Sequence, residues 1–172
     1  MQMGDVFEVL AEDHEEIRQV LSELEKGPTA ATGATEDQLM LRKIMTEELI
    51  IEEAKHAELE RRFVWPAVRG HVADGAPLAD HAVCQQIEVG ELLAELDRLD
   101  ARDPEFENLL SQFTRVGLAH FDFEERHVWP RLRAALTLKA AGDLSRTIVA
   151  AKQGASVLPS QREWASPGGN AY

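Results

Sequence analysis

Two segments of this chain repeat each other, and the repeat limits the folds that the chain can adopt. Residues 56–69 read His-Ala-Glu-Leu-Glu-Arg-Arg-Phe-Val-Trp-Pro-Ala-Val-Arg, and residues 120–133 read His-Phe-Asp-Phe-Glu-Glu-Arg-His-Val-Trp-Pro-Arg-Leu-Arg. The aligned segments share a His, a Glu, an Arg, the Val-Trp-Pro run and the final Arg. The repeat predicts that two parts of the molecule are built alike.

The segments that precede the two copies also correspond. Residues 14–24 align with residues 86–96, with matching hydrophobic positions and the same Glu-Leu ending. This alignment places His14 of the first copy opposite Gln86 of the second. The chain therefore reads as two similar halves related by an approximate twofold axis, with one imidazole missing from the second half.

Apolar residues recur at helical spacing along most of the chain, and its dominant residue types favour helices. Asp103 is a suitable helix cap, with Pro104 at the first helical position. A bend or a frayed turn is expected at Pro66, near the end of its helix. The predicted helices cover residues 5–26, 35–69, 78–99, 104–135 and 138–153.

Four long helices with short connections predict an all-α protein, an up-down-up-down four-helix bundle over residues 1–136. Residues 137–172 are predicted to add a short helix and a loosely ordered tail rich in Ser, Pro and Gly. A chain of 172 residues is long enough for one domain with a sizeable core.

The composition argues against several classes of protein. A net charge of −13 makes nucleic acids and anionic membrane surfaces unsuitable partners. The sequence contains no apolar run of the roughly 18 residues that span a bilayer, and no signal peptide is visible. Cys84 is the single cysteine, so an internal disulfide framework and thiolate metal clusters are excluded. A cytoplasmic protein is expected.

Each copy of the repeat carries a His-x-x-x-Glu pattern, which places an imidazole and a carboxylate on one helix face. Because buried charged groups need a partner or a metal, two inward-facing copies predict a shared metal site. Carboxylates can bridge two ions about 3.5–4 Å apart, and a nitrogen and oxygen ligand set suits iron, manganese or zinc. The predicted metal-binding residues are His14, His56, Glu60, Gln86, His120 and Glu124.

Other interpretations of these residues are weaker. Surface His/Glu pairs inherited by duplication would bind nothing. Glu53 and His56 together form the Glu-x-x-His spacing of ferritin-like di-iron bundles, but Gly117 stands where a matching Glu would precede His120. His81 is an alternative ligand on the third helix, five residues before Gln86. The side chains expected to take no part in metal binding are His71, Cys84, Trp65, His127 and Trp129.

The pattern resembles the hemerythrin-like family, also described as the HHE cation-binding domain. That family has a His on the first helix, His-x-x-x-Glu on the second, a His on the third and His-x-x-x-Glu on the fourth, with an aromatic-Pro pair after each motif. Residues 5–135 match this order. The chain departs from it on the third helix, where Gln86 replaces the His; Gln86 could ligate weakly, hold a water or leave a position open.

The resemblance implies two non-heme iron ions joined by an oxo or hydroxo bridge, which react with hydrogen peroxide, dioxygen or nitric oxide. Oxygen carriers of this family use five His, whereas this chain offers three. More positions should then be open to water, which favours reactivity, most of all catalase-like peroxide decomposition, over reversible oxygen binding. The alternative is an oxygen- or iron-sensing protein, or an O₂-binding protein, without turnover. Iron storage is disfavoured, because one buried site cannot accumulate a mineral.

Overall fold

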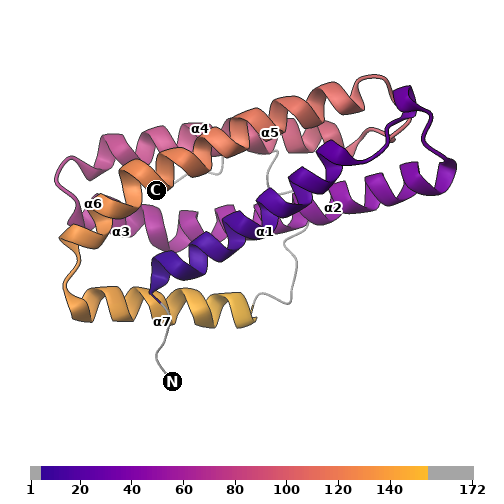
Figure 1. Ribbon diagram of the computed structural model, residues 1–172. Coiled ribbons are helices and arrows are strands. Elements are labelled where there is room, and N and C mark those ends of the chain that lie inside the picture. Colours follow the sequence, from indigo (N-terminus) through magenta and orange to yellow (C-terminus); the bar gives the residue numbers. More distant parts are fainter. Residues whose placement is uncertain (1–4, 155–172) are drawn as a thin grey trace, which may run out of the picture.

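The computed structural model describes residues 5–154, and this part of the chain forms helices and no strand. Figure 1 shows the long helices running in alternating directions along the bundle, which is the up-down-up-down order that the sequence predicted. The predicted loose tail falls on residues 155–172, outside the described residues. The long helices are α1 (Val6–Lys26), α2 (Glu36–Leu59), α4 (Gly75–Asp97) and α5 (Phe106–Phe123), and a short 3₁₀ turn, η1 (Ala30–Thr32), lies between α1 and α2.

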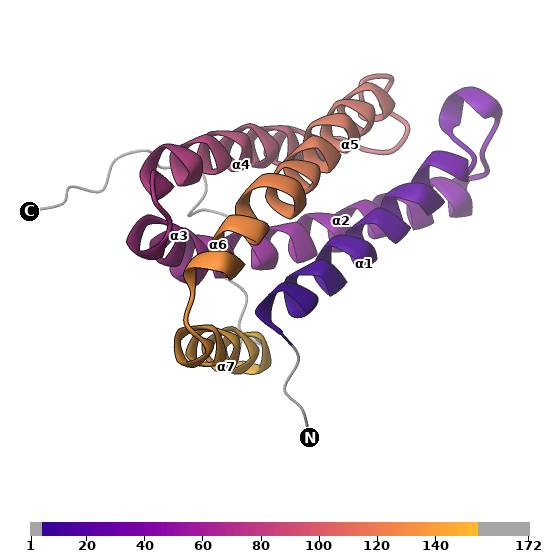
Figure 2. The ribbon, with the colours of Figure 1, turned by 60° about the vertical axis from the view of Figure 1, so that its left-hand side comes forward.

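Both copies of the repeat contain a π-helical turn directly after α2 and α5. These turns are η2 (Glu60–Val64) and η3 (Glu124–Val128), and they lead into α3 (Trp65–His71) and α6 (Trp129–Ala135). The backbone N–H of Trp65 donates to the Glu60 carbonyl, five residues back. The wider turn moves the preceding carbonyls away from the proline ring that follows, so the helix continues through a residue that normally breaks it. Figure 2 shows α3 and α6 continuing the paths of α2 and α5.

Two predicted helix starts were wrong by a few residues. Helix α4 begins at Gly75 rather than at residue 78, because Gly75 packs directly against the Val68 carbonyl, where any Cβ would lie 2.1 Å from the oxygen. Helix α5 begins at Phe106 rather than at Pro104. The Asp103 carboxylate accepts a hydrogen bond from the Glu105 N–H and forms a turn before the helix instead of capping it.

The core consists of two apolar clusters at opposite ends of the bundle, with buried polar residues between them on the long helices. One cluster lies toward the η1 end and includes Leu21, Leu49, Leu93, Phe106 and Phe113. The other lies toward the C-terminal helix, α7 (Leu138–Gly154), and includes Phe7, Leu10, Trp65, Trp129 and Leu132. Because each helix passes from one cluster to the other, the residues between them form a buried polar layer.

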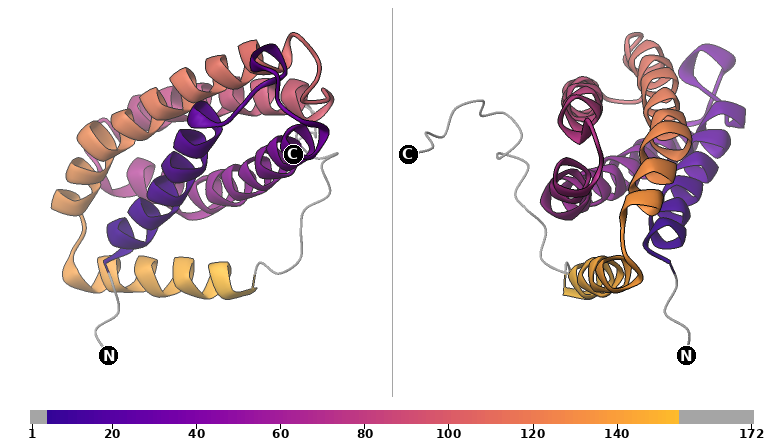
Figure 3. Two further views of the ribbon diagram at one scale, coloured as in Figure 1. Left: turned by 45° about the vertical axis from the view of Figure 1, so that its right-hand side comes forward. Right: turned by 90° about the vertical axis from the view of Figure 1, so that its left-hand side faces the viewer.

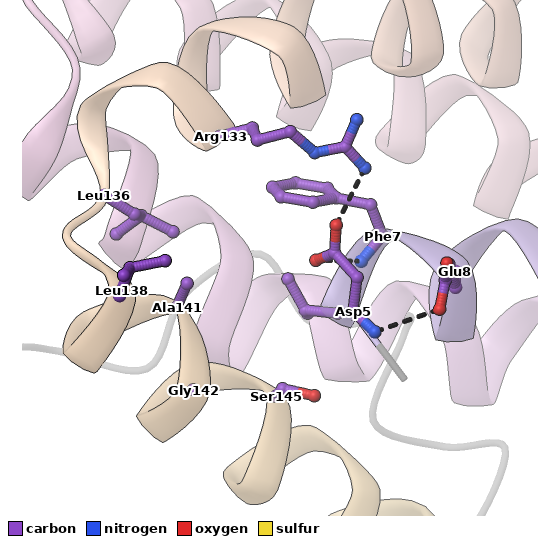
Figure 4. A pocket seen from close by; sticks show the side chains of 10 residues that line it. Asp5, Phe7, Glu8, Arg133, Leu136, Leu138, Ala141, Gly142 and Ser145 are labelled. Atoms are coloured by element: carbon purple, nitrogen blue, oxygen red, sulfur yellow. Dashed lines mark hydrogen bonds and ion pairs between the residues drawn. The ribbon is translucent and has the colours of Figure 1, made fainter. Parts of the chain in front are cut away.

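Helix α7 (Leu138–Gly154) lies outside this bundle and confirms the predicted C-terminal helix. Figures 1 and 3 show it crossing beside the N-terminal part of α1. Ile148 is fully buried against the cluster at this end. Between α7, α6 and the start of α1 lies an open groove of about 590 Å³, in which Arg133 stacks on Phe7 and pairs with Asp5 (Figure 4). Among the described residues, no helix has the length and apolar character needed to cross a membrane.

Candidate metal centre

The repeated His and Glu side chains meet in the polar layer of the bundle, as the sequence predicted. His14 comes from α1, His56 from the end of α2 and His120 from the end of α5, while Glu60 and Glu124 begin the two π-helical turns. Each of these five side chains is at most 1% exposed. The side chains of this layer are therefore shielded from bulk water.

The three imidazoles turn their Nε2 atoms toward the two carboxylates. His14 Nε2 lies 3.0 Å from His56 Nε2 and 3.2 Å from Glu124 Oε2. His56 Nε2 lies 3.4 Å from Glu60 Oε1, and His120 Nε2 lies 2.8 Å from Glu124 Oε1. The two oxygens of Glu124 thus face two different imidazoles, which is the arrangement that a carboxylate bridging two cations requires.

The outer nitrogen of each imidazole is held by a side chain that the sequence analysis did not identify. His14 Nδ1 lies 2.7 Å from Glu125 Oε1, His56 Nδ1 lies 3.2 Å from Asp13 Oδ2, and His120 Nδ1 lies 3.0 Å from Gln85 Oε1. With Nδ1–H donating outward, the Nε2 lone pair is left to point inward. Metal-binding histidines are oriented by outer partners of this kind.

Gln86 faces inward from α4, but its amide is already hydrogen-bonded. Its Oε1 accepts from the Trp65 indole N–H at 2.9 Å, and its Nε2 donates to Glu60 Oε2 at 2.6 Å. Gln86 therefore fixes the orientation of the Glu60 carboxylate and leaves Glu60 Oε1 directed at His56. That Gln86 itself binds a metal stays a prediction, and its carbonyl oxygen is occupied by the indole.

A cation between these residues fits the atoms present. Glu60 Oε1, both Glu124 oxygens and His120 Nε2 are buried and approach only one another and the neighbouring imidazoles, and among the described residues none of them has a partner with the aligned geometry of a hydrogen bond. Ligand atoms of His14, His56, Glu60 and Glu124 all lie within 4.8 Å of one another. Two nitrogens bound at right angles to a metal at about 2.1 Å would be roughly 3.0 Å apart, as those of His14 and His56 are. Hard oxygen and imidazole donors suit iron, manganese or zinc.

Burial and the close approach of several titratable groups shift the pKa values of the metal-free cluster. Burial raises the pKa of Glu124 to about 8, with a further contribution from the Glu60 carboxylate. Burial and the neighbouring His56 hold the pKa of His14 well below its usual value. Burial also opposes the protonation of His56 and His120, but Glu60, Asp13 and Glu124 outweigh it and raise both pKa values.

The remaining candidate residues lie elsewhere. His71, His81, His127 and Cys84 are exposed, and His81 packs against the Phe123 ring instead of facing the cluster. The structure does, however, bury one residue that the sequence analysis had set aside. Glu53 is 2% exposed on α2, and its Oε2 has no hydrogen-bond partner among the described residues.

Asp13 accepts a hydrogen bond from His56 Nδ1 and so orients the imidazole. Its removal is therefore expected to weaken metal binding. Asp13→Ala leaves His56 Nδ1 without its acceptor, and the loss of such an outer partner costs about 10–100-fold in metal affinity. Competition with a chelator measures this change. Glu12→Ala is the matched control, because Glu12 is the exposed neighbour on the same helix. Equal affinity of the Asp13→Ala variant and the wild type would contradict the role given to Asp13.

Without metal, the protein is expected to lose stability as the pH rises from about 6.5 to about 8. In this range the unfolded chain has released the protons of its His and Glu side chains, whereas the folded chain still holds one proton on His56 and one on the contacting pair of Glu124 and His120. The folded state then binds more protons than the unfolded state. For each extra proton, the free energy of unfolding falls by on the order of 1 kcal/mol per pH unit as the pH rises. The lowered pKa of His14 acts only below about 6.5 and has the opposite sign. Urea unfolding with a chelator present measures the trend, and rising stability over this range would contradict it.

Comparisons with known proteins agree with this geometry. The family model of the hemerythrin HHE cation-binding domain matches residues 5–132. The structure is similar to the crystal structure of a hemerythrin HHE cation-binding domain-containing protein from Mycobacterium kansasii, with a TM-score of 0.72 and 25% sequence identity over 88% of this chain and 87% of that one. A search of curated proteins finds no match to this chain. The structural likeness confirms the predicted helical-bundle fold.

Proposed function

The chain belongs to the hemerythrin HHE cation-binding family, and from this premise we propose that it is a non-heme di-iron protein that reacts with small oxidants. Peroxide decomposition is the reaction that we assign to it. The observation that carries this proposal is the convergence of three Nε2 atoms and two carboxylates in a fully buried layer. A purely structural role would not leave several of those buried polar atoms facing one another without well-aligned hydrogen bonds.

The donor set supports two ions of iron. Glu124 presents one oxygen to His14 and the other to His120, so each oxygen can serve a different cation. His56 and Glu60 add a second imidazole–carboxylate pair beside His14. When bound, a pair of iron ions would supply the two-electron exchange through which 2 H₂O₂ become 2 H₂O and O₂.

The surrounding residues hold the ligands and keep bulk water out. Glu125, Asp13 and Gln85 fix the three imidazole rings, and Arg18 in turn pairs with Glu125 at 2.7 Å. The Phe121 ring stacks on His14 with 3.8 Å between centroids and closes one side of the layer. Three imidazoles and two carboxylates cannot fill the coordination of two iron ions, so positions remain for a small oxidant.

Oxygen evolution from hydrogen peroxide tests this function. The iron-loaded protein is expected to release one O₂ for every two H₂O₂ consumed, over many turnovers, as recorded with an oxygen electrode. The control is an equal concentration of free iron with the metal-free protein, because unbound iron also decomposes peroxide. If the loaded protein evolves no more oxygen than this control, the catalase-like activity is wrong. Dioxygen and nitric oxide are the next oxidants to compare.

One contact supports a second candidate function, the sensing of iron or oxygen. Lys152 of α7 donates to Asp13 Oδ1, while Asp13 Oδ2 holds His56. A change at the metal centre could thus alter the docking of α7, which a protein partner would recognise. If removal of iron unfolds the protein or releases α7, and the loaded protein turns over no peroxide, sensing is favoured. A folded metal-free protein and rapid turnover favour the enzyme.

A further inference from the structure

We infer that Glu53 is an additional metal ligand of this centre, a third carboxylate beside Glu60 and Glu124. This inference rests on the metal site of the proposed function but not on peroxide decomposition. Glu53 precedes His56 by three residues and Glu60 by seven, so all three share one face of α2 and its continuation. That face is buried at each of the three positions.

One oxygen of the buried Glu53 carboxylate has no hydrogen-bond partner among the described residues. Its side chain is 2% exposed, and none of the described residues forms a hydrogen bond to its Oε2. Burial raises its pKa, and the imidazoles of His56 and His120 act in the opposite direction. A buried carboxylate without a partner is costly to the fold unless a cation binds it.

The two halves of the molecule differ at the positions of His14 and Glu53, and these differences support a role for Glu53 in metal binding. The first half supplies His14, which is replaced by Gln86 in the second, and the Gln86 amide is committed to Trp65 and Glu60. The second half also has Gly117 where the first has Glu53, so this carboxylate exists once. Glu53 thus adds an anionic donor to a centre that lacks a third-helix imidazole.

The charge of the centre leads to the same assignment. Two divalent cations carry four positive charges, and Glu60 and Glu124 neutralise two of them. Because uncompensated charge in a buried layer is costly, a third carboxylate brings the site closer to neutrality. Glu53 is the one further buried Asp or Glu among the described residues, and it shares its helix face with His56 and Glu60.

Titration of the metal-free protein with cobalt(II) tests the inference. The wild type is expected to bind two equivalents tightly, whereas Glu53→Gln binds one tightly and the second at least about tenfold more weakly, with an altered visible spectrum. Glu52→Gln is the matched control, because Glu52 is the exposed neighbour that pairs with Lys55. Two tight equivalents and an unchanged spectrum in the Glu53→Gln variant would overturn the inference.

The melting temperature of the same variants separates ligation from a structural role. Glu53→Gln removes a buried charge but keeps the side-chain shape, so the metal-free variant should melt at or above the wild-type temperature while gaining less from cobalt. A metal-free Glu53→Gln protein that melts well below the wild type would show that Glu53 serves the fold instead. If the wild type binds two ions yet decomposes no peroxide, the proposed function fails and the titration still decides the role of Glu53.

Discussion

Replacing Glu124 with glutamine is expected to abolish tight metal binding while the bundle remains folded. Glu124 is fully buried, and its two oxygens face His14 at 3.2 Å and His120 at 2.8 Å. In the proposed two-metal centre, a neutral amide in this place would remove an anionic donor from both cations. The affinity for each ion should fall by at least about 100-fold, the upper end of what the loss of an outer hydrogen-bond partner costs. Metal analysis after gel filtration measures the loss.

The metal-free form of this variant provides an internal check. Because burial raises the pKa of Glu124 to about 8, the carboxylate is unfavourable in the absence of metal. The metal-free Glu124→Gln protein should therefore be no less stable than the metal-free wild type above pH 8. Asp122→Asn is the control, since Asp122 is exposed on the same helix and pairs with Arg126. Retention of two ions per chain by Glu124→Gln would contradict the bridging role.

Removal of metal from the wild type is expected to lower the melting temperature by about 15 °C or more. An ion present at about 1,000 times its dissociation constant stabilises the folded state by about 4 kcal/mol, and two ions contribute about twice as much. For a domain of this size, each kcal/mol corresponds to roughly 2–4 °C. The proposed ligands come from α1, α2, α5 and the two π-helical turns, so bound ions would join the halves of the bundle.

Differential scanning calorimetry of the metal-free and iron-loaded protein measures this shift. Readdition of iron to the metal-free sample should restore the higher transition, which serves as the control for damage by the chelator. Equal melting temperatures in both states would mean that metal binding contributes nothing to folding, and the buried polar layer would then need another explanation.

The positions of the main ligands were predictable because they depend on local periodicity. A His and a Glu four residues apart must share a helix face, and the repeat requires that His56 with Glu60 and His120 with Glu124 be treated alike. The structure places all four in one buried layer together with His14. The fold followed from the same spacing, since four apolar stripes bury themselves most simply as a bundle.

The outer partners of the imidazoles were not predictable in this way. Asp13 and Glu125 reach His56 and His14 from other helices, and Gln85 reaches His120 from α4. These contacts between helices depend on the relative rotation and register of the packed helices. The periodicity of a single helix carries no information on either.

The burial of Glu53 was not predicted from the sequence. The sequence argument gave Glu53 little weight because Gly117 breaks the match, yet the structure buries the side chain. The two halves of a duplicated chain diverge in sequence. A site that lies between them can therefore take more donor atoms from one half than from the other. The π-helical turns were missed for a related reason: Pro66 predicts a disturbed helix, but the sequence does not show whether the helix bends, frays or widens.

The metal content of the purified protein, measured together with its optical spectrum, tests the central claim most directly. The proposed centre predicts two iron ions per chain after expression in iron-replete medium, with a charge-transfer band in the near ultraviolet that disappears in the Glu124→Gln variant. A wild-type protein that takes up no stoichiometric metal, in the cell or on reconstitution, would contradict the claim that the buried imidazoles and carboxylates form a metal centre.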